Sequence, residues 1–175
     1  MRRKFLFSLA ALLAGVSPCL AQVSAAPASR NAVFLELLGN GGVYSINYER
    51  MVNDRLGIHL GYGVWSSPLF FQGTPPNRYQ SVPVSVSYLF GSGERKLEIG
   101  GGVTFGRGMF DRGSGGRDFS FRSLTAVVGY RSQPRRRGYL FRAGLTPFYS
   151  FEDGEEAYPD PGFTFSAGVS FGYRF

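Results

Sequence analysis

The fold is decided by the stretch FTFSAGVSFGYRF, residues 163–175, in which two kinds of side chain alternate strictly. All seven odd positions are apolar or aromatic, and all six even positions are small or polar. Side chains of a β-strand point alternately to its two faces, so the pattern predicts a strand with one apolar and one small polar face. The aromatic face runs to the last residue, Phe175, and raises the question of what it contacts.

The amino-terminal 21 residues have the organisation of a secretory signal peptide. A basic start, MRRK, precedes an apolar stretch at residues 5–16 that is too short to span a bilayer as a helix, and small residues follow it. Cleavage is expected after Ala21, although cuts as late as Ala28 fit the same pattern, and an uncleaved membrane anchor is the alternative. The predicted divisions are a signal peptide at 1–21, a short segment at 22–30 and a single domain at 31–175.

The single cysteine, Cys19, lies within the predicted signal peptide. Lipid modification is the alternative, but Pro18 directly before it fits a lipoprotein signal badly. Without Cys19 the mature chain has no thiol, and so neither a disulfide framework nor a cysteine metal site. The chain has 19 Lys and Arg and 12 Asp and Glu, a net charge of +7, and three of the positive charges belong to the signal peptide. Nucleic-acid binding is not expected of an exported chain without a nucleic-acid motif.

Alternation recurs along the chain and predicts eight strands. One of the clearest repeats is LGIHLGYGVW, residues 56–65, where large apolar side chains alternate with Gly and His. The chain has 17 Phe and 10 Tyr, which suits a barrel whose outer face touches lipid and carries aromatic girdles. The strands are expected at residues 32–39, 43–52, 55–65, 80–90, 96–107, 119–131, 138–151 and 163–175.

The connections between these strands alternate in length, as in an up-and-down outer-membrane barrel. VNDR, GSGER and SQPRRR are short and rich in turn residues, whereas SSPLFFQGTPPNRY, GMFDRGSGGRD and EDGEEAYPDPG are long. Only the first external connection, LGNGG, is short. Joining the strands on either side of it gives a seven-strand alternative, but Asn40-Gly41 is a strong hairpin signal and an odd count breaks the alternation.

Two prolines, Pro83 and Pro147, lie inside predicted strands. Proline cannot donate a hydrogen bond to a strand ladder and usually argues against a central strand. A bulge, or a position near a rim, is expected to accommodate each of them.

Over residues 31–175 the chain resembles the small outer-membrane β-barrel family typified by the transmembrane domain of outer membrane protein A and by outer membrane protein X. The C-terminal SFGYRF, with Phe171, Tyr173 and Phe175, is similar to the signal that the barrel-assembly machinery reads in that family. ELLGNGGVYSINYER, residues 36–50, also looks like an amino-terminal hairpin of uncharacterised barrel proteins.

This resemblance implies an all-β, eight-stranded antiparallel up-and-down transmembrane β-barrel in the cell outer membrane, whose last strand closes against its first. It implies a monomer whose partners are outer-membrane lipids and, during biogenesis, the barrel-assembly machinery and periplasmic chaperones. The family has several functions, so the resemblance supports an inference of fold and location better than an inference of function.

Inward-facing charges are the first candidate site. If the apolar face of each strand meets lipid, the opposite face lines a lumen that, in an eight-stranded barrel, is filled by side chains. Charges there must be paired or hydrated. A network near the periplasmic mouth, either a structural set of salt bridges or a gate or proton-linked site, is expected from Glu36, Glu49, His59, Glu98, Arg142 and Arg174. The same reasoning places Asn47 and Arg122 on the inner face.

Arginines around the second long connection are the second candidate site. Guanidinium groups suit phosphates. Two interpretations fit these residues: their guanidiniums contact lipid phosphates of the outer leaflet, or they are exposed to water. The residues are Arg107, Arg112, Arg117 and Arg122.

His59, the only histidine, bears on whether the chain is an enzyme. A catalytic histidine needs a nucleophile or an orienting carboxylate beside it. Two enzymes of this barrel size, the lipid A palmitoyltransferase and the lipid A deacylase, use a His with a Ser and an acidic residue near the outer rim or lipid face. His59 is instead expected to point inward from the lower half of its strand. No catalytic residue, metal site or cofactor is assigned.

The sequence therefore predicts a non-enzymatic outer-membrane protein that serves envelope structure or surface interaction through its extracellular loops. A lipid A-modifying barrel enzyme is one alternative, and it requires His59 beside a nucleophile at the rim. A small porin-like pore is another, and it requires a lumen that is wet along its length. In a soluble lipocalin-like binding barrel, the third alternative, the interior is a ligand pocket.

Overall fold

The computed structural model describes residues 29–66, 77–110, 117–151 and 162–175. The predicted signal peptide at 1–21 and its cleavage sites lie outside the described residues and stay predictions. The described residues form eight strands: β1 (Asn31–Leu37), β2 (Tyr44–Met51), β3 (Leu56–Ser66), β4 (Asn77–Phe90), β5 (Arg95–Phe110), β6 (Arg117–Ser132), β7 (Gly138–Phe151) and β8 (Gly162–Arg174). Each pairs antiparallel with its neighbours along the chain, and β8 pairs with β1. The predicted all-β, eight-stranded, up-and-down barrel is confirmed.

The closing seam joins the first and last strands of the domain. β8 runs antiparallel to β1, with Phe171 opposite Leu35. Pairing continues to the last residue, because the Phe175 N–H donates to the Asn31 carbonyl at 2.8 Å. The strand quoted at the outset therefore closes the barrel. β1 and β2 are separate partners in a hairpin, so the seven-strand alternative is wrong.

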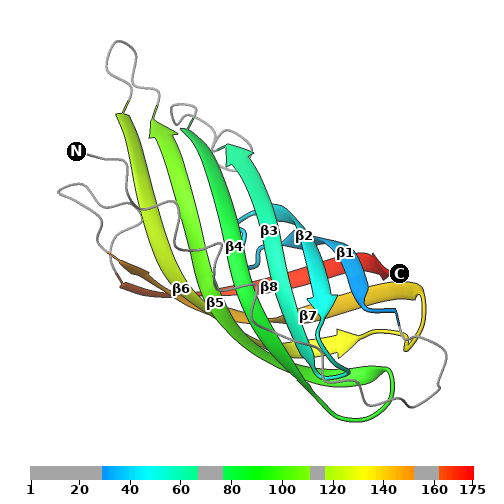
Figure 1. Ribbon diagram of the computed structural model, residues 1–175. Helices are drawn as coiled ribbons and strands as arrows, with labels where there is room; N and C mark the ends of the chain where they lie inside the picture. Colours follow the sequence, from blue (N-terminus) through cyan, green and yellow to red (C-terminus); the bar gives the residue numbers. More distant parts are fainter. Residues whose placement is uncertain (1–28, 67–76, 111–116, 152–161) are drawn as a thin grey trace, which may run out of the picture.

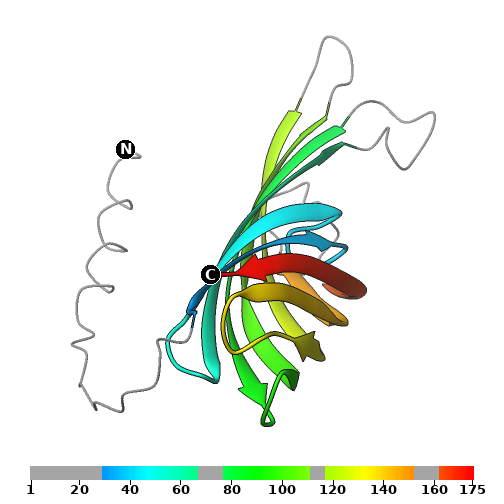
Figure 2. The ribbon, with the colours of Figure 1, turned by 90° about the vertical axis from the view of Figure 1, so that its right-hand side faces the viewer.

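The barrel has two unlike ends. The short-turn end carries residues 52–55, 91–94 and 133–137 and both ends of the domain, and we call the opposite end, where β3, β5 and β7 finish, the loop end. β4, β5 and β6 have 14, 16 and 16 residues, against 7 and 8 in β1 and β2. The long strands reach past the others toward the loop end as a curved wall (Figure 1, Figure 2).

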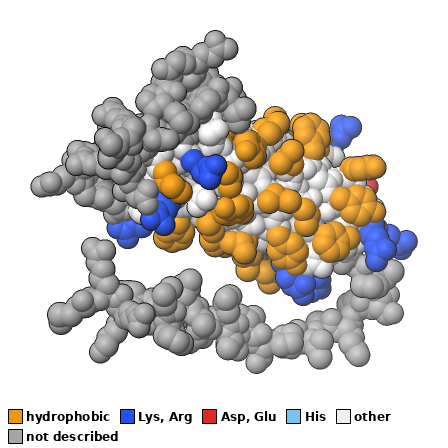
Figure 3. All heavy atoms as spheres, turned by 90° about the horizontal axis from the view of Figure 1, so that it is seen from above, with side chains coloured by type: hydrophobic (Ala, Val, Ile, Leu, Met, Phe, Trp, Pro, Cys, Tyr) orange, Lys and Arg blue, Asp and Glu red, His pale blue; other side chains and the backbone are white. Residues whose placement is uncertain are grey.

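The two faces of the wall have opposite character. Large hydrophobic side chains are exposed on the outer face of every strand, with Ile46, Leu60 and Leu145 at 58, 53 and 57%. They cover much of the outer surface, while Lys and Arg gather toward its ends (Figure 3). The inner face instead buries hydroxyls, carboxylates and guanidiniums. Alternation along each strand thus separates an apolar exterior from a polar interior, as the sequence predicts.

Pro83 and Pro147 are accommodated without a change of register. β3 and β4 keep one register on both sides of Pro83, and β6 and β7 do so around Pro147, but each ladder is interrupted beside its proline. The ladder on the other side of each proline, β4–β5 or β7–β8, is continuous. Because proline lacks an N–H, it leaves a gap in one ladder only. The bulge that the sequence suggested is therefore wrong for these two strands.

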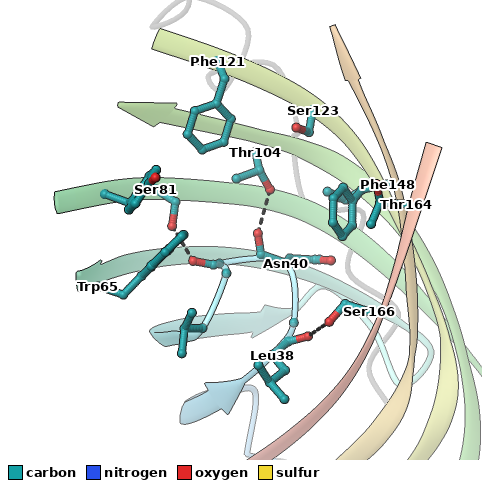
Figure 4. A pocket seen from close by; sticks show the side chains of 16 residues that line it. Leu38, Asn40, Trp65, Ser81, Thr104, Phe121, Ser123, Phe148, Thr164 and Ser166 are labelled. Atoms are coloured by element: carbon teal, nitrogen blue, oxygen red, sulfur yellow. Dashed lines mark hydrogen bonds between the residues drawn. The ribbon is translucent and has the colours of Figure 1, made fainter. Parts of the chain in front are cut away.

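Residues 38–43, between β1 and β2, fold into the lumen, and we call them the inward turn. Hydroxyls of three strands donate to its backbone carbonyls: Ser81 of β4 to Gly41 at 2.6 Å, Thr104 of β5 to Asn40 at 3.0 Å, and Ser166 of the adjacent β8 to Leu38 (Figure 4). Leu38 has a positive φ of 59°, which ends β1 at Leu37, two residues before the expected boundary. The sequence predicted a short external connection here. The structure corrects this, because the turn lies inside the wall.

Candidate functional site

The lower lumen, toward the short-turn end, holds two buried ion pairs. Arg131 of β6 donates from both η nitrogens to the two carboxylate oxygens of Glu49 in β2. Arg142 of β7 donates from Nε and Nη2 to Glu98 of β5 at 2.8 and 2.9 Å. Arg131 and Glu49 are 0% exposed and Glu98 is 1% exposed. The planar fork of each guanidinium matches its carboxylate, so each buried charge is paired by two hydrogen bonds.

The two ion pairs touch each other and His59. Arg131 Nη1 lies 3.6 Å from Glu98 Oε1, and His59 Nε2 lies 3.2 Å from Glu49 Oε2 and 3.8 Å from Glu98 Oε1. The same ring nitrogen lies 2.7 Å from the Ser87 hydroxyl. We call this group the charge cluster, and its members are Glu36, Glu49, His59, Glu98, Arg131 and Arg142.

Glu36 connects the charge cluster to the inward turn. Its Oε1 lies 3.9 Å from Arg142 Nη1, and its carboxylate accepts a hydrogen bond from the Gly41 N–H. Ser45 Oγ donates to the same carboxylate at 3.4 Å. A Cβ added at Gly39 would lie 2.2 Å from Glu36 Cδ, so only glycine lets the turn pack directly on this carboxylate.

Apolar side chains close the lumen below the charge cluster. Phe34, Met51, Leu89 and Leu140 are at most 2% exposed. The Arg142 guanidinium lies 4.7 Å from the centre of the Phe34 ring, within the range of a cation–π contact. From the short-turn end to the inward turn the described side chains therefore fill the lumen, as expected for eight strands.

The structure places the residues of the expected lumen network as follows. Glu36, Glu49, His59, Glu98 and Arg142 lie together in the charge cluster. Arg174 is also buried, but its guanidinium donates to the backbone carbonyls of Ser29 at 2.6 Å and Pro134 at 2.9 Å. It forms no ion pair with the described carboxylates of the charge cluster and instead holds the two ends of the domain near the turn after β6.

The sequence analysis assigned the wrong arginine of β6 to the lumen. Arg122 is exposed on the outer face, which it shares with Leu124 and Tyr130 at 50 and 43% exposure. Its assignment to the inner face is therefore wrong. Arg131, which was missed, has the opposite parity and pairs with Glu49. The sequence carried a partial signal, because Leu124, Val128 and Tyr130 share the parity of Arg122 and so place Arg131 inside, although Phe121 and Val127 have the other parity.

The expected arginine rim is described only in part. Arg107 of β5 and Arg122 of β6 have exposed side chains on the outer face of the long wall, toward the loop end. Arg117 begins β6, where its backbone pairs with that of Phe110, and Arg112 lies outside the described residues. Contact of these guanidiniums with lipid phosphates stays a prediction.

No three His, Cys, Asp or Glu side chains within residues 29–66, 77–110, 117–151 and 162–175 are grouped so that they could hold a metal ion. Those ranges contain no helix long and apolar enough to cross a membrane. The chemistry of the lower lumen is thus that of carboxylates bound by guanidiniums.

A closed eight-stranded barrel with an apolar outer face and a polar, filled lumen defines the class of protein. Among solved structures, the chain is similar to the N-terminal β-barrel domain of Pseudomonas aeruginosa OprF, with a TM-score of 0.61 and 14% identity over 83% of this chain and 96% of that one. It is similar to Neisserial surface protein A, with a TM-score of 0.54 and 17% identity over 82% and 91% of the two chains.

A third similar structure is Ail, the attachment invasion locus protein of Yersinia pestis, with a TM-score of 0.50 and 14% identity over 83% of this chain and 94% of that one. No protein-family model and no curated protein matches the chain. At such low identities the likeness shows the fold alone. The chain therefore has the fold of the small eight-stranded outer-membrane barrels, and the resemblance noted in the sequence is confirmed at that level.

Proposed function

We propose that the chain is a non-enzymatic protein of the cell outer membrane that serves envelope structure or surface interaction through its loop end. The observation that carries this proposal is the distribution of side chains across the wall. Exposed Ile, Leu, Val, Phe and Tyr lie on the outer face of the strands, whereas the buried carboxylates and guanidiniums lie on the inner face. Water would penalise such a surface, whereas lipid favours it.

The geometry of His59 argues against catalysis. Its Nε2 faces both Ser87 Oγ at 2.7 Å and Glu49 Oε2 at 3.2 Å. In a catalytic triad the hydroxyl and the carboxylate bind different ring nitrogens, so that one orients the ring while the other loses its proton. His59, Ser87 and Glu49 are 4, 2 and 0% exposed and lie away from the loop-end rim. A lipid substrate has no access to the hydroxyl, which disfavours the lipid A-modifying alternative.

The packing of the lumen disfavours the other two alternatives. A porin-like pore needs a continuous wet path, yet the charge cluster and the apolar layer beneath it are buried. A soluble lipocalin-like barrel needs a polar exterior, and this exterior is apolar. The same outer face supports outer-membrane lipids as partners and a monomeric state, since a closed barrel leaves no strand edge for a second copy.

Phe171, Tyr173 and Phe175 all face outward on the closing strand, at 60, 45 and 45% exposure. Their side chains stay accessible while β8 pairs with β1, which is consistent with recognition of this segment by the barrel-assembly machinery. We include this C-terminal assembly signal, and passage through periplasmic chaperones, in the proposal.

The test is electrophoresis of cell fractions with and without boiling. A band of mature size in the outer-membrane fraction that changes mobility on boiling is expected, because a closed barrel resists detergent until heated. A periplasmic, soluble band that does not shift would overturn the proposal and favour a soluble binding barrel. A shift combined with ion conductance of the purified protein in planar bilayers would instead favour the pore.

A further inference from the structure

Above the inward turn, the loop-end half of the lumen contains a cavity of about 320 Å³. Its floor is the inward turn, and its wall includes Trp65, Tyr79, Phe121 and Phe148 together with Ser and Thr hydroxyls (Figure 4). We call it the cup. Pockets that bind small molecules have volumes of roughly 300–1,000 Å³, so the cup is large enough for a small ligand.

Two polar atoms of the cup are buried without a hydrogen-bond partner among the described residues: Asn40 Oδ1 and Thr125 Oγ1. Thr125 is 8% exposed. Other polar groups there are occupied, since Ser81 and Thr104 donate to the inward turn and Ser123 shares a hydrogen bond of 3.0 Å with Ser150. Buried polar groups in native proteins are nearly always paired, so an unpaired amide oxygen and an unpaired hydroxyl on two residues that line one cavity indicate a ligand that pairs with them.

The chemistry of the lining narrows the class of ligand. None of the described residues that line the cup carries a charge, so an ionic ligand would lose its hydration without compensation. Trp65 and Tyr79 stack with ring centres 3.9 Å apart, which gives the cup one flat aromatic wall. Flat aromatic walls suit ring-shaped ligands. The Asn40 carboxamide oxygen can only accept a hydrogen bond, so the ligand must donate one.

We propose that the cup binds a neutral, largely apolar ring compound that carries a hydroxyl or N–H donor. The ring lies against the aromatic wall, and the donor pairs with Asn40 Oδ1 and Thr125 Oγ1. The inference goes beyond the proposed function, because binding of this kind does not depend on how the barrel acts in an envelope. The inward turn supplies both the floor and one of the polar groups.

Trp65 is the only tryptophan of the chain, so its fluorescence reports directly on the cup. The experiment titrates folded full-length protein in lipid nanodiscs with 4-tert-butylphenol and, in parallel, with 4-tert-butylanisole, excited beyond the absorption of the phenol. The two probes share the tert-butyl-substituted ring, and the anisole is larger by one methyl group; only the phenol donates a hydrogen bond. It is neutral at pH 7, since phenols ionise near pH 10. Protein-free nanodiscs give the correction for partition into lipid.

The expected result is a saturable change of Trp65 emission, with the phenol bound roughly threefold to tenfold more tightly than the anisole, which corresponds to one buried hydrogen bond. Asn40→Ala and Thr125→Val are each expected to reduce that preference. Ser120→Ala, which removes an exposed hydroxyl from the same strand, is the matched control and is expected to leave it unchanged.

An unsaturable signal, or equal affinity of the wild-type protein for phenol and anisole, would overturn the proposal. A preference that survives in both Asn40→Ala and Thr125→Val would also overturn it, because binding would then lie elsewhere. Each variant is first checked for a heat-modifiable band. If a variant does not fold, titration of the wild-type protein with 4-tert-butyltoluene, in which a methyl group of similar size replaces the hydroxyl, decides the matter: equal affinity for phenol and toluene overturns the proposal.

Discussion

Replacing Arg142 with Met is expected to lower the free energy of unfolding by about 3–5 kcal/mol, because it leaves a buried carboxylate without its partner. Arg142 is 7% exposed and Glu98 is 1% exposed, so water cannot take the place of the guanidinium. Two hydrogen bonds, at 2.8 and 2.9 Å, are lost. Arg131, 3.6 Å from Glu98, remains as a partial partner, so we expect a loss of unfolding free energy near the lower end of that range. Met keeps much of the stem volume, so the loss is mainly electrostatic.

The assay is urea unfolding in lipid vesicles, followed by Trp65 emission and by the heat-modifiable band. The double variant Arg142→Met, Glu98→Gln removes both charges and is expected to recover at least half of the loss. Arg50→Met, at an exposed position that hydrogen-bonds Asn31 at 2.9 Å, is the matched control and is expected to stay within about 1 kcal/mol of wild type.

A cost below about 1 kcal/mol for Arg142→Met, as exposed ion pairs show, would refute the reasoning. The charge cluster would then be hydrated, and the lumen would be wet enough to favour a pore. Conductance in planar bilayers checks the same point, since Arg142→Ala is expected to raise a leak that is low in the wild-type protein.

Three further changes test the turn, the outer face and the last residue. Leu38→Val is expected to destabilise by at least about 1 kcal/mol because a β-branched residue is strained at a φ of 59°, whereas Leu38→Gly stays within about 1 kcal/mol of wild type in urea unfolding. Leu145→Arg, on the outer face, is expected to cost about 2–4 kcal/mol in vesicles, while Tyr139→Arg near the short-turn end costs about 0–1 kcal/mol; equal costs would contradict a membrane boundary. Phe175→Ala is expected to lower the outer-membrane level in cells, measured by immunoblot, while unfolding in vitro changes by less than about 1 kcal/mol; an unchanged cellular level would count against the assembly signal.

The number and approximate positions of the strands were predictable, because they depend only on the local alternation of apolar and polar residues. Alternation in a barrel wall is imposed by lipid on one face and a narrow lumen on the other, and it repeats in each strand. The strand 138–151 was predicted with the bounds that β7 has. The sixth strand shows that a charged residue cannot be assigned to the lumen from its charge alone, without the alternation of the residues around it. Arg122 and Arg131 are both plausible lumen residues, and only the parity of their apolar neighbours separates them.

The inward turn was not predictable from its own residues. LGNGG has the composition of any tight hairpin connection, and nothing within it indicates which side of the wall it occupies. Its position is fixed by Ser81, Thr104 and Ser166, which lie 40 or more residues away in the chain. The cup depends on the same distant contacts, so neither its floor nor the unpaired Asn40 oxygen could be derived before the fold was known. The ion pairs of the charge cluster likewise join residues 44 and 82 positions apart.

Glu36 is in contact with both the charge cluster and the floor of the cup. Its carboxylate meets Arg142 on one side and the Gly41 N–H on the other, and Gly41 also accepts from Ser81 in the floor of the cup. Loss of Arg142 leaves the Glu36 carboxylate without its guanidinium, and a buried carboxylate without a partner charge is costly unless water reaches it. The inward turn should then move so that water reaches Glu36, and Trp65 packs on that turn, with its Nε1 only 2.7 Å from the place of a Cβ on Gly42. We therefore expect the charge cluster to hold the floor of the cup in place. Such a role would be a reason for an eight-stranded barrel to keep three carboxylates and two guanidiniums in a lumen that apolar side chains could fill.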